Sequence, residues 1–242
     1  MNFQNSNRKN KRANSFFQSA LFFFCLISFS CTMVGFHRAS IRNEIDFGKE
    51  ENLRLCVWKD KKISHKDLID LIDIWNGELN HYKIKIRLSE VKNWERPGWT
   101  GFAIMDEVFM TKLPNQCDRL LAVAGGKISD TVFEIVGIFF AFFGIPSFQV
   151  LGAVETKTGT RGYILGQTRT ISHWLSGGAS GTLIHEGYHL LGCGHSFFLS
   201  ECYLQIQKVK ELKRKNNISG VPFFPSVDED GNVFLKNPWD PE

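Results

Sequence analysis

The sequence predicts a single α+β domain, and three observations point to it. A strand, a helix and a second strand follow one another over residues 53–88. Two later apolar runs, 120–124 and 163–168, are typical of buried strands. A helix that carries several histidines follows the last of these runs. The chain of 242 residues is long enough for one domain with a substantial core.

The opening elements rest on periodicity and on one capping residue. Leu53–Trp58 is a short run of alternating character, which predicts a strand. Ser64 is a suitable N-cap for a helix, and Asp67 stands three residues further on. Residues 82–88 alternate again and predict a half-buried strand with a basic outer face. The helix up to Asn80 has one apolar stripe, formed by Leu68, Leu71, Ile72, Trp75 and Leu79.

The second half of the chain completes the predicted sheet and ends in a helix. We expect residues 148–154 to form an edge strand, whose unpaired backbone groups could bind an extended peptide by strand addition. Residues 163–168 form the last strand before the helix with the histidines. Residues 204–215 suit a C-terminal helix, with the basic run 208–215 on its solvated face.

The longest uncharged stretch is 135–154, which has the length of a transmembrane helix. Glycines and Pro146 interrupt it, and a span here would place the strands of 53–124 and the histidine helix on opposite sides of a membrane. We therefore expect two buried elements joined at Gly144-Ile145-Pro146. A hydrophobic substrate wall or a surface that contacts a membrane is the alternative.

Residues 185–195 read His-Glu-Gly-Tyr-His-Leu-Leu-Gly-Cys-Gly-His and predict a metal site. His185 and His189 are four residues apart, so a helix presents them on one face. Gly192 can end that helix in a left-handed conformation and let the chain return with His195. Three neutral nitrogen ligands that leave one position open are typical of catalytic zinc. Glu186 is placed to act on water as a general base.

This run resembles the signature HExxHxxGxxH of the metzincin clan of zinc endopeptidases. The flanks, residues 179–184 and Ser196, are similar to the matrixin branch. The resemblance implies a twisted mixed sheet above an active-site helix, a C-terminal helix and a cleft for a peptide. It also implies Zn²⁺ held by His185, His189 and His195, with Glu186 as the catalytic base that hydrolyses a peptide or protein substrate. An exported zinc-binding lipoprotein that recognises a protein partner without cleaving it is the alternative.

One feature of the clan is absent from this chain. Metzincins have a methionine in a tight turn beneath the metal, whereas no methionine follows His195 here. We expect Cys202 or Leu204 to form the apolar floor of the site in its place.

The first thirty residues predict a signal peptide. A basic segment with Arg8, Lys9, Lys11 and Arg12 precedes the short apolar run Leu21–Ile27. Ser28-Phe29-Ser30-Cys31 resembles a bacterial lipobox, although Ser28 stands where leucine is usual. The resemblance implies lipidation of Cys31, a lipidated tether over residues 31–52 and a peptidase domain over 53–242. The protein would then be anchored by lipid in the bacterial cell envelope; simple secretion and an uncleaved anchor are the alternatives.

The charge of the chain argues against nucleic acid as a partner. The chain has 29 basic and 25 acidic side chains, and residues 1–30 contribute four basic and no acidic ones. The rest is therefore balanced, and nothing favours a polyanion. We expect a monomer whose partners are a peptide substrate and, through the lipid anchor, a membrane.

Four cysteines remain after residue 31, an even number that suits an oxidising compartment. Three pairings are open to them, and free thiols are a further possibility. The pairing Cys193–Cys202 with Cys56–Cys117 is attractive, because the first of these bonds would brace the loop that delivers His195.

Overall fold

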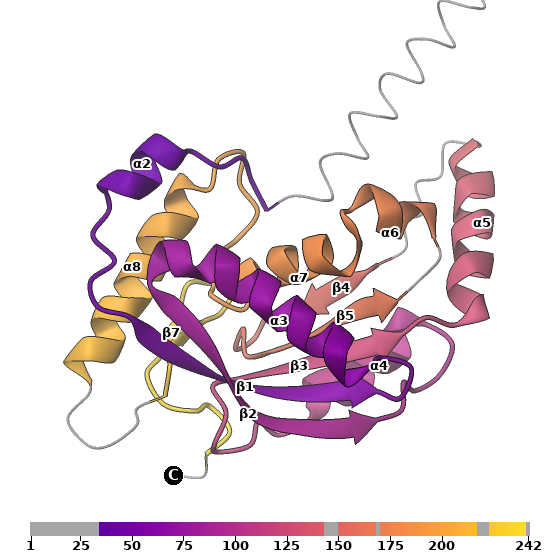
Figure 1. Cartoon of the computed structure of the whole chain (residues 1–242), viewed down its shortest axis with the longest axis horizontal. Helices are drawn as coiled ribbons and strands as arrows, with labels where there is room; N and C mark the ends of the chain where they lie inside the picture. The colour runs from indigo at the N-terminus through magenta and orange to yellow at the C-terminus, as the bar shows by residue number, and fades with distance from the viewer. Residues whose placement is uncertain (1–33, 143–149, 168–169, 217–222, 241–242) are drawn as a thin grey trace, which may run out of the picture.

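The computed structural model describes residues 34–142, 150–167, 170–216 and 223–240. They form an α+β fold in which helices cover both faces of a mixed sheet (Figure 1). This confirms the predicted fold class. The predicted signal peptide at 1–30 and the predicted lipidation site Cys31 lie outside the described residues.

The sheet has five strands in the order β2-β1-β3-β5-β4. Four are parallel, and the short β4 pairs antiparallel with β5 at one edge. Every predicted strand is present and most are longer than predicted, but of the expected edge strand 148–154 only Gly152–Val154 is strand (β4), and residues 148–149 lie outside the described residues. The strands are β1 (Glu51–Asp60), β2 (Ile84–Trp94), β3 (Arg119–Gly125), β4 (Gly152–Val154) and β5 (Arg161–Gln167); β6 (Ser226–Val227) and β7 (Val233–Phe234) form a separate pair.

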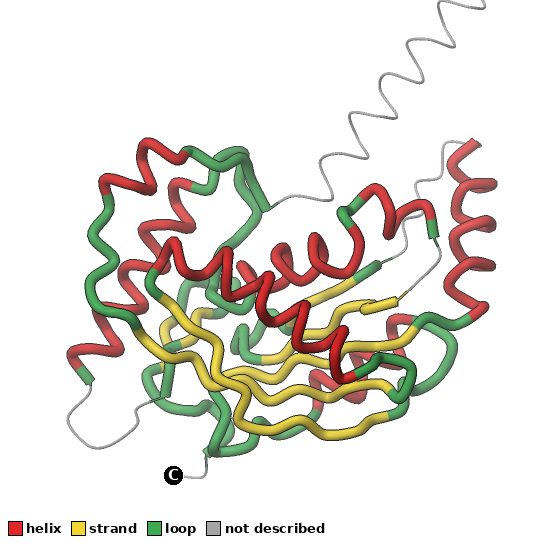
Figure 2. The backbone as a smooth tube through the Cα atoms, viewed as in Figure 1, coloured by secondary structure: helices red, strands yellow, loops and turns green. Residues whose placement is uncertain are grey.

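Helices surround the sheet, as the tube in Figure 2 shows. The histidine helix is α7, and the predicted C-terminal helix is α8. The helices are α2 (Ala39–Glu44), α3 (His65–Leu79), α4 (Gly101–Met110), α5 (Ile128–Phe142), α6 (Ile171–Leu175), α7 (Gly178–His189) and α8 (Ser200–Lys215), with a 3₁₀ turn η1 (Asn80–Tyr82).

Two hydrophobic cores lie on opposite faces of the sheet, because successive strand residues face opposite sides. Leu55 and Val57 of β1 join the larger core with α3, α7 and α8. Cys56, between them in sequence, joins the smaller core with α4. Helix α7, which carries the histidines, therefore rests on the larger core.

Helix α3 begins as predicted and buries the predicted stripe. The Ser64 hydroxyl accepts a hydrogen bond from the backbone N–H of Asp67 at 3.0 Å. All five stripe residues are buried, and the indole of Trp75 faces α7 at Gly187. A Cβ at Gly187 would collide with that indole, so the close approach of α3 and α7 requires glycine there.

We expect Gly187→Ala to lower the free energy of unfolding by about 1–3 kcal/mol, the usual effect of overpacking a core. Gly77→Ala is the matched control, since a Cβ at this exposed glycine of α3 would meet nothing within 4 Å. The control should raise stability by up to about 1 kcal/mol because alanine favours the helix. Denaturant unfolding of the two variants checks this; equal stability would contradict the close packing of α3 on α7.

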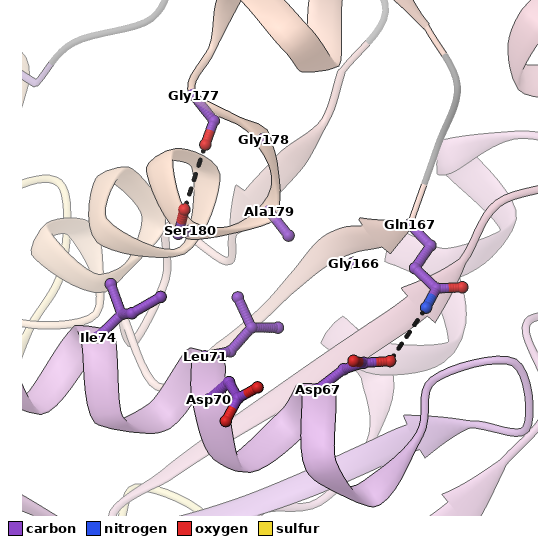
Figure 3. Close-up of a pocket in the computed structure, with 10 residues that line it drawn as sticks. All are labelled: Asp67, Asp70, Leu71, Ile74, Gly166, Gln167, Gly177, Gly178, Ala179 and Ser180. Atoms are coloured by element: carbon purple, nitrogen blue, oxygen red, sulfur yellow. Dashed lines mark hydrogen bonds between the residues drawn. The ribbon is translucent and has the colours of Figure 1, made fainter.

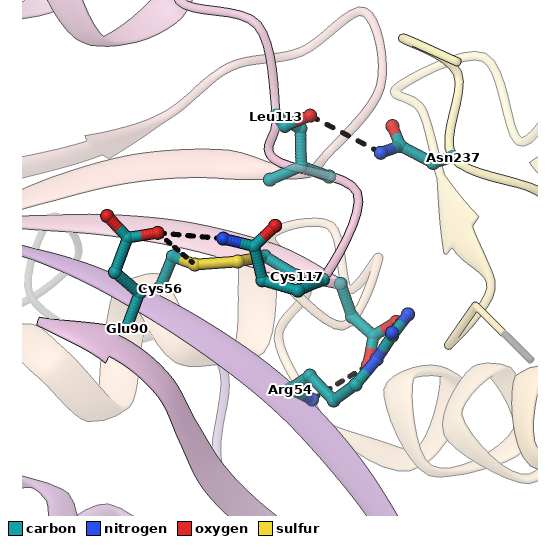
Figure 4. Close-up of a disulfide and its surroundings, with 8 residues drawn as sticks. Arg54, Cys56, Glu90, Leu113, Cys117 and Asn237 are labelled. Carbon is teal, nitrogen blue, oxygen red and sulfur yellow. Dashed lines mark hydrogen bonds and ion pairs between the residues drawn. A yellow bond between two sulfur atoms is a disulfide. The ribbon is translucent and has the colours of Figure 1, made fainter. Parts of the chain in front are cut away.

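A disulfide joins β1 to the segment that enters β3. Cys56 and Cys117 are bonded, with their Cα atoms 5.7 Å apart (Figure 4). The guanidinium of Arg54 pairs beside it with the buried carboxylate of Asp118, at 2.8 Å. The second predicted pair, Cys193–Cys202, is also bonded, so the structure selects one of the three pairings.

The prediction of a tether over residues 31–52 is wrong for its described part. Val34 and Phe47 are buried in the larger core, α2 packs near α8, and β1 begins at Glu51. The polar composition of this segment concealed its few apolar contacts. The domain therefore includes residues from Val34 onward.

The prediction that residues 135–154 are buried is wrong for the part within α5. Its apolar side chains point outward: Ile135 and Phe139 are 61% and 58% exposed. Its buried groups include the carboxylates of Asp130 and Glu134. Among the described residues, no helix is both long and apolar enough to cross a membrane.

The basic run 208–215 is also not simply solvated. Lys210 is fully buried, and its ammonium group donates to the carbonyl groups of Lys49, Tyr82 and Lys83 at 2.7–3.0 Å. Lys213 is buried as well and donates to the carbonyl of Asn52 at 2.6 Å. Their ammonium groups hold α8 against β1 and η1.

Candidate metal centre

Three histidines converge at the C-terminal end of α7. His185 and His189 lie one turn apart, and their Nε2 atoms are 3.2 Å from each other. Gly192 has a φ of 86°, which turns the chain back toward the helix and brings His195 beside both rings. One donor atom from each residue lies within 4.8 Å of the others, so the three can hold a metal ion. The structure thus brings together the three histidines that the sequence predicts.

A hydrogen bond of His189 decides which of its two ring nitrogens is available to bind a metal ion. Its Nδ1 lies 2.7 Å from the carbonyl oxygen of Cys193. A carbonyl only accepts, so Nδ1 carries the hydrogen and Nε2 carries the lone pair that faces His185. Burial lowers the pKa of His189, which favours the neutral, metal-binding form.

The loop between the second and third histidines is held by the disulfide Cys193–Cys202, whose Cα atoms are 4.9 Å apart. Both cysteines are buried. Because the carbonyl of Cys193 contacts Nδ1 of His189, the disulfide braces a group that orients one of the three histidines. The prediction for Leu204 is wrong: this side chain is 57% exposed on α8 and does not form a buried floor. Cys202 is buried, but in the disulfide with Cys193.

Glu186 is buried beside the edge strand of the sheet. A Cβ at Gly152 of β4 would lie 2.6 Å from Cγ of Glu186, so the absence of a side chain at Gly152 makes room for the carboxylate. Burial raises the pKa of Glu186 to about 8. A carboxyl group in such a place readily accepts a proton near neutral pH, and a nearby cation would favour its ionised form.

Two sets of hydrogen bonds that hold the segments around the histidines could not be predicted from the sequence. The backbone of residues 34–36 pairs with the segment after His195: Ser196 N–H donates to the carbonyl of Val34, and Phe36 N–H to that of Phe197, each at 2.9 Å. The buried guanidinium of Arg119 donates to the carbonyl of Leu190 at 2.7 Å, where α7 ends. Both contacts join residues far apart in the chain.

We expect Gly35→Ala to weaken metal binding, because a Cβ there would lie 2.6 Å from the carbonyl oxygen of Ser196. The collision would displace the loop that follows His195, and loss of such a support typically lowers metal affinity about 10–100-fold. Gly194→Ala is the matched control, since a Cβ at this exposed neighbour of His195 would meet nothing within 4 Å. Metal titration should separate the two variants; equal affinities would show that residues 34–36 do not support the site.

A pocket of about 330 Å³ lies between α3 and the N-terminal end of α7 (Figure 3). The carboxylates of its wall already have partners: Asp67 accepts from Gln167 at 3.2 Å, and Asp70 from Lys66 at 2.6 Å. None of the three histidines lines it. We therefore assign the site to the histidine cluster and not to this pocket.

The chain matches no protein-family model and no curated protein. Its function is argued below from the arrangement of its own residues.

Proposed function

We propose that this protein is a zinc-dependent endopeptidase that hydrolyses peptide bonds with Glu186 as the general base. One observation carries the proposal: three histidine nitrogens converge, and the glutamate next to the first histidine in the sequence is buried against the edge strand of the sheet. A metal site that only stabilises a fold has no need of a base in that position.

The donor set and its spacing fit zinc. Zinc–nitrogen bonds are about 2.0–2.1 Å long, so two ligands of a tetrahedral ion lie about 3.3 Å apart. The Nε2 atoms of His185 and His189 are 3.2 Å apart. Two nitrogen lone pairs that face each other at this distance repel unless a proton or a cation lies between them. His195 would complete the set, and three protein ligands leave a position for substrate or water.

When bound here, zinc would supply a Lewis acid that polarises a peptide carbonyl and acidifies water. The residues of the chain account for the movement of the proton. Glu186 would take the proton from the attacking water and pass it to the leaving amine. Its burial, which raises its pKa to about 8, suits a group that must both accept and release a proton near neutral pH.

The free edge of β4 supports an extended peptide as substrate. Within the described sheet β4 pairs on one side only, with β5, so its other edge can bind a peptide by strand addition. Gly152 of that strand contacts Glu186, so a peptide bound along β4 would pass close to the base.

The match of residues 185–195 to the metzincin signature supports the same function. The two disulfides support export, because disulfides persist mainly in oxidising compartments. We therefore place the protein outside the cytoplasm, with a lipid anchor at Cys31 as part of the proposal.

Removal of the metal tests the proposal. We expect the purified protein to contain about one zinc per chain and to cleave members of a broad peptide library, to lose cleavage after chelation, and to regain it when zinc is added back. Mass spectrometry of the products also reports the preferred bond. Zinc binding with no cleavage of any peptide would contradict the enzyme and favour a zinc-binding protein that recognises a partner.

A further inference from the structure

Helix α5 buries acidic side chains and exposes apolar ones. A surface helix normally buries its apolar face and exposes its polar one. In α5 the carboxylates of Asp130 and Glu134 are 3% and 8% exposed, whereas the apolar side chains face solvent. The exposed ones are Ile128, Val132, Phe133, Ile135, Val136, Ile138, Phe139 and Phe140.

Polar contacts hold α5 in this orientation. The carboxylate of Asp130 makes two 2.7 Å hydrogen bonds to the buried guanidinium of Arg96. Glu134 accepts from the backbone N–H groups of Ile171 and Ser172, at 2.9 and 2.6 Å, where α6 begins. The outward apolar face is therefore fixed by buried ion pairing and capping, and it is joined to α6.

Helix α6 continues the exposed apolar surface. Ile171, Trp174 and Leu175 are 59%, 78% and 54% exposed. None of the exposed side chains of α5 and α6 named here is charged, so nothing in the surface would attract a strongly charged partner. An exposed apolar surface of this extent marks a contact with an apolar partner or a membrane.

A third apolar group lies where the chain enters the described structure. Phe36 and Phe197 are 52% and 72% exposed, and their rings lie 5.4 Å apart. In Figure 1, the beginning of the described chain, α6 and the C-terminal end of α5 all lie along the upper side of the molecule, while the sheet lies below. We call the exposed apolar side chains of α5 from Ile135 onward and those of α6, together with Phe36 and Phe197, the apolar edge.

The chain before Val34 indicates what covers this edge. Cys31 comes three residues before Val34 in the sequence. Three residues of fully extended chain span at most about 11 Å, so the Cα atom of Cys31 cannot lie farther than this from that of Val34. A lipid on Cys31, or an uncleaved apolar run at Leu21–Ile27, would hold the Val34 end of the domain close to a bilayer. The apolar edge lies on that same side.

We propose that the apolar edge rests on the surface of a lipid bilayer. The exposed apolar side chains of α5 from Ile135 onward and those of α6 contact the acyl boundary, with Trp174 in the interfacial position that tryptophan favours. Arg38, exposed beside Phe198 with its guanidinium 3.9 Å from that ring, lies near the edge and can meet lipid phosphates. His195 directly precedes the segment 196–199, so the metal centre is held near the bilayer.

Tryptophan fluorescence tests this orientation in the protein with its own anchor. Of the six tryptophans, Trp174 and Trp99 are the highly exposed ones, at 78% and 74%. Trp99 follows Gly98, whose carbonyl accepts a hydrogen bond from Lys127 Nζ at 2.5 Å, so its backbone lies beside the N-terminal end of α5, which the apolar edge does not include. The protein is reconstituted in phosphatidylcholine vesicles with brominated acyl chains, which quench tryptophans that they contact, and in unbrominated vesicles as the reference.

We expect quenching by bromine in the wild type, a decrease of more than about two-fold in Trp174→Phe, and little change in the control Trp99→Phe. Both side chains are exposed, so neither change should unfold the domain. Quenching that is equal in wild type and Trp174→Phe would overturn the proposal. Absence of quenching together with a dimer in detergent would show that a second copy covers the edge instead. The readout involves no peptide cleavage, so its failure would leave the proposed hydrolysis untouched.

Discussion

Glu186→Gln is expected to lower the rate of peptide cleavage about 10²–10⁴-fold while zinc remains bound, because the change removes the proposed general base and leaves the three histidines intact. The carboxyl group is buried, and its burial favours the uncharged form. A neutral amide of the same shape should therefore keep the domain folded.

Cleavage rates on one library-derived peptide, with zinc analysis of the same samples, measure this effect. Glu201→Gln is the matched control, since this exposed glutamate lies in the first turn of α8, close in sequence to the site. The control should cleave at the wild-type rate. A Glu186→Gln protein that binds zinc and cleaves as fast as the wild type would refute Glu186 as the base.

Removal of the disulfide Cys193–Cys202 is the second large change. The double replacement of both cysteines by alanine should lower zinc affinity about 10–100-fold, because the carbonyl of Cys193 would no longer be held beneath His189. The two cysteines are nine positions apart in the sequence, and closing so short a loop stabilises a fold by about 2–3 kcal/mol.

The other disulfide provides a control, because its removal should lower stability more and zinc affinity less. Cys56 and Cys117 lie in the core on the other face of the sheet, and 61 residues separate them. Their replacement by alanine should cost about 4 kcal/mol of stability and leave the zinc affinity of the folded protein unchanged. Denaturant unfolding and zinc titration of the two double variants check both quantities. Weakened zinc binding in both variants alike would show that general loss of stability, and not the orientation of His189, is responsible.

The features that the sequence predicted correctly depend on residues close together in the chain. The stripe of α3 and its Ser64 cap follow from helical periodicity and one side chain. The convergence of His185, His189 and His195 follows from one helical turn and a glycine that permits a left-handed φ. Strand positions were predicted well because buried strands need continuous or alternating apolar residues.

The wrong predictions concern which side of an element faces the protein. An apolar run resembles core from its composition alone, but α5 turns its carboxylates inward because Arg96, 34 residues before Asp130, is buried there. The basic run of α8 resembles a solvated face, but Lys210 and Lys213 are buried. Their ammonium groups donate to backbone carbonyls of residues 49, 52, 82 and 83. These contacts join distant segments, and no local pattern records them.

The sequence by itself therefore determined most of the secondary elements and the convergence of the three histidines, since the spacing of the histidines is set by the geometry of one helix and one turn. Only the tertiary structure decided which cysteines pair, that residues 34–36 pair with the loop after His195, and that Gly152 of β4 makes room for Glu186. It also decided that α5 presents an apolar face to its surroundings. The reason is physical: burial and long-range pairing depend on the free energy of the whole packed chain, whereas periodicity and capping depend on a few neighbouring residues.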